Sequence, residues 1–164
     1  MIKMSSAGEA IASLLEKDTK CIVFLHNTKH EETAKMIMCE GFLFEEQLTY
    51  SCDRVNPLDL VEINYFLVER KEYGKFTVVI QINRDIFNKL NIAAETADLT
   101  IEDLLTISKP VLSDNDEYIY KLDPHFIKGY FDIKTGKFRS NKKFNPEYKT
   151  KSYIEVLKQL ERRE

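Results

Sequence analysis

Apolar residues recur at helical spacing in five stretches of the chain. The spacing predicts helices over residues 5–17, 31–40, 57–71, 84–90 and 150–163. Gly41 follows the second stretch, where a glycine commonly ends a helix because positive φ costs it little. Asn56 and Pro57 suit the N-cap and the first position of the third stretch.

Runs of strand-forming residues alternate with these helices. They predict strands over 21–26, 76–82, 117–122 and 126–133, the last two side by side, and a hairpin turn over 134–137. The order lacks a regular strand–helix–strand repeat. It therefore predicts an α+β fold with a mostly antiparallel central sheet, flanked by helices in a single domain over 1–164.

Composition narrows the class of protein. The chain has 164 residues, 24 Lys and Arg against 27 Asp and Glu, and 43% hydrophobic residues, which favours a folded domain over a disordered one. It contains no apolar run of roughly 20 residues and opens without the apolar stretch of a secretory signal. We therefore expect a cytoplasmic protein without a membrane partner, and three cysteines that do not all pair.

Several common chemistries lack their signatures here. The three histidines, His26, His30 and His125, do not have the spacing of a helical zinc site, so no metal is expected. The five glycines are scattered singly, which argues against a phosphate-binding glycine loop. No serine stands in a nucleophile-elbow context.

Three positions remain as candidates for chemistry, each with a plainer alternative. His26 ends a buried strand, where a scaffold presents side chains to a cleft, or where a histidine simply bonds a neighbouring loop. Tyr50 and Ser51 combine a stacking ring with a hydroxyl, or end a strand. Glu117 follows an acidic turn and could stabilise positive charge on a ribose, or serve solubility alone.

The order of these motifs resembles the mono-ADP-ribosyltransferase superfamily, which includes ADP-ribosylating toxins and poly(ADP-ribose) polymerases. The segment 23–28 (VFLHNT) resembles the family's first strand, and the helix that follows ends at Gly41 and Phe42. The segment 48–51 (LTYS) resembles its second motif, a strand before a helix. Glu117 opens a later strand, which is followed by 123–130 (DPHFIKGY). The resemblance covers about residues 21–133, after a helix in 1–20 and before a basic hairpin and helix in 134–164.

This resemblance implies a split, mostly antiparallel sheet and an NAD-dependent enzyme that transfers ADP-ribose to a macromolecular acceptor. His26 would bond a ribose, and the backbone near Asn27 and Thr28 would hold the carboxamide of NAD. Tyr50 or Tyr65 would stack on the nicotinamide, with Ser51 beside it. Glu117 would bind the ribose 2′-hydroxyl and stabilise the oxocarbenium-like transition state.

Two other functions stay open from the sequence. A non-enzymatic protein of the same fold could bind a protein partner through its sheet or its C-terminal helix. The stretch 134–151 holds seven Lys and Arg against one acid, with aromatic residues between them, and is weakly typical of a nucleic-acid surface.

Overall fold

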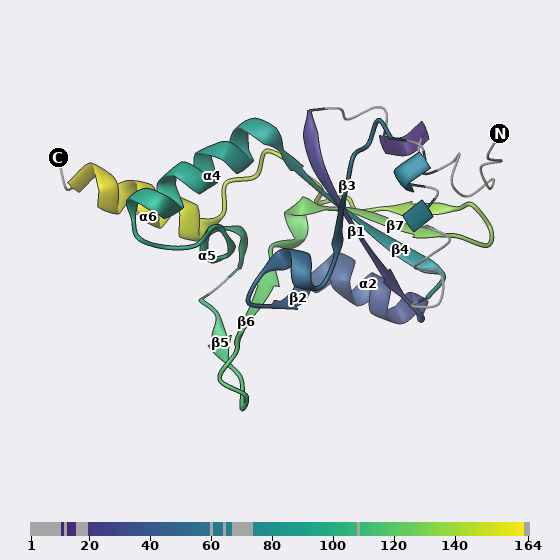
Figure 1. Ribbon diagram of the computed structural model, residues 1–164, viewed down its shortest axis with the longest axis horizontal. Helices are drawn as coiled ribbons and strands as arrows, with labels where there is room; N and C mark the ends of the chain where they lie inside the picture. Colours follow the sequence, from purple (N-terminus) through teal and green to yellow (C-terminus); the bar gives the residue numbers. More distant parts are fainter. Residues whose placement is uncertain are drawn as a thin grey trace.

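A five-stranded antiparallel sheet lies at the centre of the molecule (Figure 1). The computed structural model describes residues 11, 13–15, 20–59, 61–63, 65–66, 74–107 and 109–162. The central strand is β4 (Phe76–Asn83), whose eight residues are all buried. In order across the sheet, the strands are β3 (Asp53–Val55), β1 (Cys21–Thr28), β4, β7 (Ile127–Asp132) and β8 (Phe138–Ser140). A charge-free, β-branched sequence makes β4 suited to this position.

A smaller sheet packs beside the first. It consists of β2 (Phe42–Glu45), β6 (Tyr118–Leu122) and β5 (Val111–Leu112), with β6 in the middle and both pairs antiparallel. The rings of Phe44 and Tyr120 stack with their centroids 5.2 Å apart. Both rings belong to the same hydrophobic cluster as one face of the large sheet, so the two sheets share a core.

The two faces of the large sheet are covered by different elements. Helix α2 (Glu31–Glu40) packs over the face that carries Ile22 and Phe24. Val23 and Leu25, whose side chains point to the opposite face by strand alternation, pack against four residues from helical segments. These four are Ile11, Leu15, Ile63 and Phe66.

Three helices gather at one end of the molecule (Figure 1). They are α4 (Arg84–Thr96), α5 (Ile101–Leu105) and α6 (Lys151–Arg162). The Asn83 side chain caps α4 by accepting hydrogen bonds from the backbone N–H groups of Asp85 and Ile86. Thr100 and Asp103 form a capping box at the start of α5. Two short 3-10 helices, η1 (Leu48–Tyr50) and η3 (Pro124–Phe126), connect strands elsewhere.

Gly74 lies against the end of β1. A Cβ atom at this position would come within 2.0 Å of the carbonyl carbon and oxygen of Thr28, and the φ of Gly74 is +140°. Any side chain at residue 74 would therefore overlap the backbone of β1. The segment entering β4 and the end of β1 touch backbone to backbone, which only glycine permits.

The predicted α+β fold with a central antiparallel sheet flanked by helices is confirmed. Helix 31–40 and strand 76–82 lie where they were predicted, and residues 11 and 13–15 are helical inside the predicted first helix. The rest of that helix, much of 57–71 and residues 163–164 lie outside the described residues. The helix predicted over 84–90 continues to Thr96.

Two local predictions are wrong. Residues 48–50 form the 3-10 helix η1 instead of a strand, because the chain turns between β2 and β3 there. The strands predicted over 117–122 and 126–133 are not neighbours: β6 lies in the small sheet and β7 in the large one. The 3-10 turn at Pro124, capped by the Asp123 side chain, separates them.

Candidate functional site

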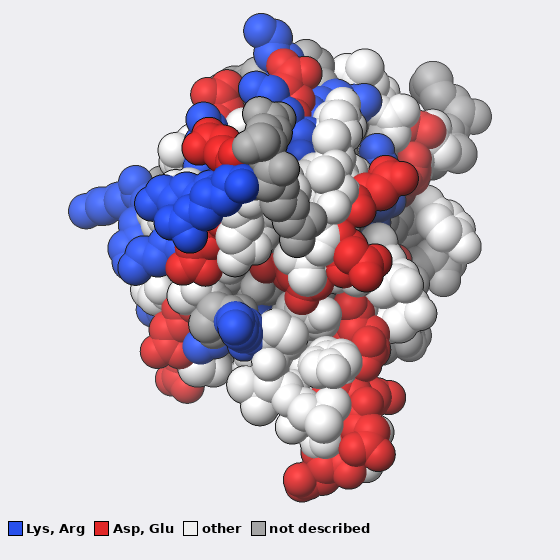
Figure 2. Space-filling view, turned by 90° about the vertical axis from the view of Figure 1, so that its left-hand side faces the viewer, with Lys and Arg blue, Asp and Glu red and all other residues white. Residues whose placement is uncertain are grey.

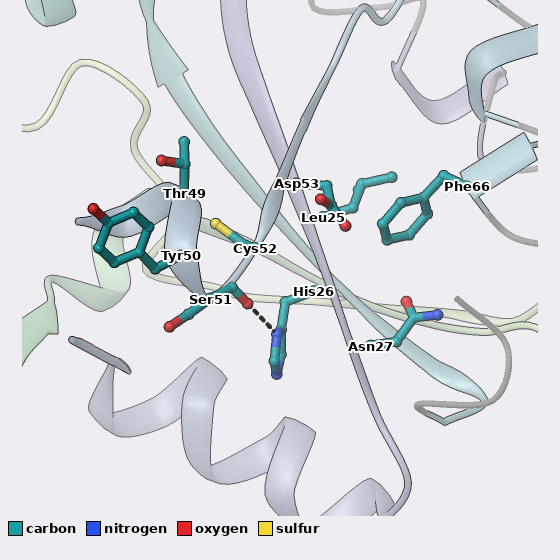
Figure 3. A pocket seen from close by; sticks show the side chains of 9 residues that line it. All are labelled: Leu25, His26, Asn27, Thr49, Tyr50, Ser51, Cys52, Asp53 and Phe66. Atoms are coloured by element: carbon teal, nitrogen blue, oxygen red, sulfur yellow. Dashed lines mark hydrogen bonds between the residues drawn. The ribbon is translucent and has the colours of Figure 1, made fainter. Parts of the chain in front are cut away.

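A pocket of about 350 Å³ lies at the edge of the large sheet, where β1 continues beyond Asp53, the first residue of β3. The β1–β3 ladder ends at the pair Leu25–Asp53, and His26 and Asn27 follow it on β1. Nine residues line the pocket: Leu25, His26, Asn27, Thr49, Tyr50, Ser51, Cys52, Asp53 and Phe66. Figure 3 shows Thr49, Tyr50, Ser51, Cys52 and the His26 ring on one side of β1, and Leu25, Asn27, Asp53 and Phe66 on the other. The volume is at the lower end of the range of about 300–1,000 Å³ for small-molecule sites.

His26 is held in one orientation at this pocket. Its Nδ1 lies 2.7 Å from the carbonyl oxygen of Ser51 (Figure 3), and its ring packs on the Phe42 ring with centroids 4.7 Å apart. A carbonyl oxygen can only accept, so Nδ1 carries the proton and donates it. Burial lowers the pKa of His26 below its ordinary value. The hydrogen bond to the Ser51 carbonyl and the charge of Asp53 raise the pKa, but by less than burial lowers it. The neutral ring therefore keeps an unprotonated Nε2, which can accept a hydrogen bond from a hydroxyl group.

The Asn27 amide is oriented from the neighbouring strand. The Thr77 hydroxyl, fully buried on β4, donates a 2.7 Å hydrogen bond to Oδ1 of Asn27. The register pairs these two residues directly across β1 and β4. This hydrogen bond directs Oδ1 of Asn27 toward β4 and fixes the orientation of the amide at this side of the pocket.

Cys52 contributes shape to the pocket and no thiolate. Its thiol is buried and donates a 3.2 Å hydrogen bond to the carbonyl of Leu48. Burial, helped by the charge of Asp53, raises the pKa of Cys52 far above its ordinary value. A thiol that stays protonated at neutral pH is a poor nucleophile, so covalent cysteine chemistry is not supported at this site.

The structure brings together four of the seven residues that the sequence singled out. His26, Asn27, Tyr50 and Ser51 line the pocket, and the Tyr50 side chain is 69% exposed at its edge. Thr28 and Tyr65 do not line it. Phe66, the neighbour of Tyr65, supplies the aromatic ring on that side instead.

Glu117 lies in the connection between β5 and β6 of the small sheet, outside the lining of the His26 pocket. It precedes β6 in the β5–β6 hairpin, and Asp and Glu gather at the tip of that hairpin in Figure 2. A hydrogen bond with the Glu45 carboxyl, together with the Glu45 charge, raises the pKa of Glu117. The ring of Phe42, at the start of β2, packs on the ring of His26. Glu45, the partner of Glu117, lies three residues further along the same strand, and three residues of strand span about 10 Å.

Three contributors to the site were missed by the sequence reasoning. Asp53 supplies the carboxylate in the pocket, Phe66 supplies a wall and Thr77 orients Asn27. Asp53 stands two residues after Ser51, so extending the second motif would have found it. Phe66 and Thr77 carry no local signal, because each reaches the site only through the packing of distant elements.

The described part of the chain contains no group of three or more His, Cys, Asp or Glu side chains arranged to hold a metal ion. Among the same residues, no helix is both long and apolar enough to cross a membrane. Comparison with protein-family models, curated proteins and solved structures found no significant match to this chain. Its function must therefore be inferred from the pocket itself.

Proposed function

We propose that the chain binds NAD at the His26 pocket and transfers ADP-ribose to a macromolecular acceptor, releasing nicotinamide. One observation carries the proposal: His26 and Ser51, which belong to two motifs separated by 25 positions, meet in one pocket through a direct hydrogen bond. The resemblance to the mono-ADP-ribosyltransferase superfamily implies that these two motifs bind the same molecule of NAD.

The chemistry of the pocket suits the nucleoside half of NAD. The Nε2 of His26 can accept a hydrogen bond from a ribose hydroxyl, and backbone groups at Asn27 can hold the carboxamide. Tyr50 and Phe66 present aromatic rings on two sides of the space. A dinucleotide exceeds a pocket of this volume, so the other half of NAD would extend along the surface.

The reaction breaks the C–N bond between nicotinamide and ribose. Nicotinamide leaves with the bonding electron pair, and a nucleophilic atom of the acceptor forms the new bond to the ribose carbon and loses its proton. Positive charge develops on the ribose in the transition state, and a carboxylate nearby stabilises it. Glu117 is the carboxylate that the resemblance assigns to this role, and Asp53 is the one that lines the pocket.

A titration with NAD, combined with an assay for released nicotinamide, tests the proposal. We expect saturable binding that His26→Ala weakens about tenfold, which corresponds to one lost hydrogen bond and its packing. His30→Ala is the matched control, because His30 is exposed and does not line the pocket. If NAD does not bind the wild-type protein and nicotinamide is released no faster than in buffer, the proposal fails.

Binding without transfer is the second candidate function. The position of Glu117 outside the pocket lining favours it, because the catalytic carboxylate would have to act from the small sheet. Saturable NAD binding with no nicotinamide release, in the presence and absence of cell extract as a source of acceptors, would identify this function.

Support for nucleic-acid binding through 134–151 is weaker. Two aromatic side chains of this stretch make contacts within the fold. The rings of Tyr148 and His125 stack with their centroids 3.7 Å apart, and the Lys128 Nζ lies 6.0 Å from the centroid of the Phe144 ring. Rings in such contacts are not presented for stacking on bases.

A further inference from the structure

A second cavity, of about 480 Å³, lies further along the same edge of the large sheet. It is lined by Ile22, Arg54, Val55, Asn56, Pro57, Leu58, Glu62 and Arg84. No residue lines both cavities, although Asp53 of the first and Arg54 of the second are consecutive on β3. What this second cavity holds can be inferred from its charges and walls.

Two arginines from distant parts of the sequence converge here. Arg54 on β3 pairs with Phe24 of β1, and its side chain lies on the same face of the sheet as that of Ile22 by strand alternation. Arg84 follows β4, and its backbone N–H donates to the carbonyl of Lys20, so the ladder with β1 extends to this point. Arg54 on β3 and Arg84, the first residue of α4 directly after β4, therefore flank Ile22 on either side of β1.

Among the residues that the structure describes, the positive charge of this cavity is not fully neutralised. Neither Arg54 nor Arg84 forms an ion pair with another residue in the described ranges. The cavity contains one acid, Glu62, whose Oε1 accepts a 3.4 Å hydrogen bond from the backbone of Asn56. Two guanidinium groups against one carboxylate leave a net positive charge, which attracts an anion.

The remaining wall is apolar. Ile22, Val55 and Pro57 are buried, and Leu58 is 65% exposed beside them. A cavity of this volume is larger than an inorganic anion needs, and its apolar wall offers contact to an organic group. Guanidinium groups bind phosphate oxygens in a bidentate manner, with more geometric specificity than a lysine provides.

We propose that this cavity binds a small organic phosphate, with Arg54 and Arg84 on the phosphate and the organic group against Pro57 and Leu58. The proposal does not depend on the function proposed for the His26 pocket. It assigns a second ligand site to the other end of β3, along the same edge of the sheet.

Calorimetric titration of the full chain with three probes tests the proposal: adenosine monophosphate, adenosine and inorganic phosphate. We expect adenosine monophosphate to bind most tightly, because it alone uses both the arginines and the apolar wall. Arg54→Gln or Arg84→Gln should weaken its binding about tenfold to a hundredfold, as expected for a lost charged hydrogen bond. Added salt should weaken the wild-type interaction as well.

Matched variants distinguish binding at this cavity from binding elsewhere on the protein. Arg139→Gln removes an exposed arginine of β8 that lies outside both cavities and should bind the nucleotide as the wild type does. His26→Ala should also retain it, whatever its effect on NAD. Arg54→Lys and Arg84→Lys keep the charge, so their affinity for adenosine monophosphate should lie between that of the wild type and that of the glutamine variants. Unfolding in urea shows whether each variant is folded.

Three results would overturn the proposal. The first is that neither adenosine monophosphate nor inorganic phosphate binds at millimolar concentration. The second is that adenosine binds as tightly as its monophosphate. The third is that the folded variants Arg54→Gln and Arg84→Gln bind adenosine monophosphate as tightly as the wild type does. If His26→Ala alone loses this binding, the nucleotide binds at the His26 pocket and the proposal fails in the same way.

Discussion

The imidazole of His26 and the carbonyl of Ser51 are joined by a 2.7 Å hydrogen bond that ties β1 to the turn before β3. The bond requires a proton on Nδ1, and the partly buried ring is neutral because burial lowers its pKa. The charge state of this histidine is thus linked to the stability of the fold, because a proton on Nε2 would place a charge on a partly buried ring.

Stability should fall as the pH is lowered through about 6.5, the ordinary pKa of histidine. Below this value the unfolded chain binds a proton at His26 that the native ring, with its lowered pKa, does not yet bind. The contribution of His26 is therefore complete above that pH and is lost as the pH falls toward the native pKa. Urea unfolding between pH 7.5 and 5 measures it.

His26→Gln should flatten this pH dependence, since it removes the titrating group. His30→Gln, at an exposed position, is the control and should leave the slope unchanged. Equal slopes for the wild type and His26→Gln would show that His26 does not contribute.

Gln81→Met should stabilise the protein by about 1–3 kcal/mol. Gln81 is fully buried on β4, and within the described part of the chain neither its Nε2 nor its Oε1 has a hydrogen-bond partner. Methionine has a similar shape and no polar group to satisfy. The free energy of unfolding in urea gives the difference, and a destabilised variant would indicate that the amide has a partner in solution, such as a buried water molecule.

Gly74→Ala should destabilise the fold by more than about 2 kcal/mol, because its Cβ would overlap the Thr28 backbone at positive φ. Gly136 offers a matched control. Its φ is +75°, but a Cβ there would meet nothing within 4 Å, so Gly136→Ala should cost only about 1 kcal/mol of conformational strain. Equal unfolding free energies for the two variants would contradict the argument from space.

Glu117→Gln should slow nicotinamide release about 10²–10³-fold while leaving NAD binding within a factor of a few, if its charge acts only in the transition state. Glu32→Gln, an exposed position on α2, is the control. Asp53→Asn tests the carboxylate in the pocket in parallel. A large loss in Asp53→Asn with an unaffected Glu117→Gln would transfer the role to Asp53 and refute the assignment to Glu117.

Most of the long elements could be predicted from the sequence because each has a strong local pattern. The uncharged, β-branched run 76–82 predicts a strand, and the helical spacing of Ala34 and Ile37 predicts α2. Strands β2, β3 and β5 have four, three and two residues. Segments this short contain too few residues to show the alternation of apolar and polar side chains that is typical of a strand. They form because they pair with neighbouring strands.

The site was only partly accessible from the sequence for a related reason. His26 is conspicuous because a polar residue interrupts the end of an apolar run, and Tyr50 and Ser51 stand before a polar stretch. Whether Glu117 reaches them depends on how the two sheets pack, which no local pattern specifies. The sequence places β6 and β7 in succession, yet the turn at Pro124 sends them to different sheets.

The contact between Gly74 and Thr28 has a practical consequence for genetic screens. A survey of random substitutions scored only by activity would rank Gly74 beside the residues that touch a ligand, although its lack of a side chain serves space alone. Measuring cellular abundance together with activity separates the two cases. Substitutions of Gly74 deplete the protein, whereas those that remove only a ligand contact leave its level unchanged.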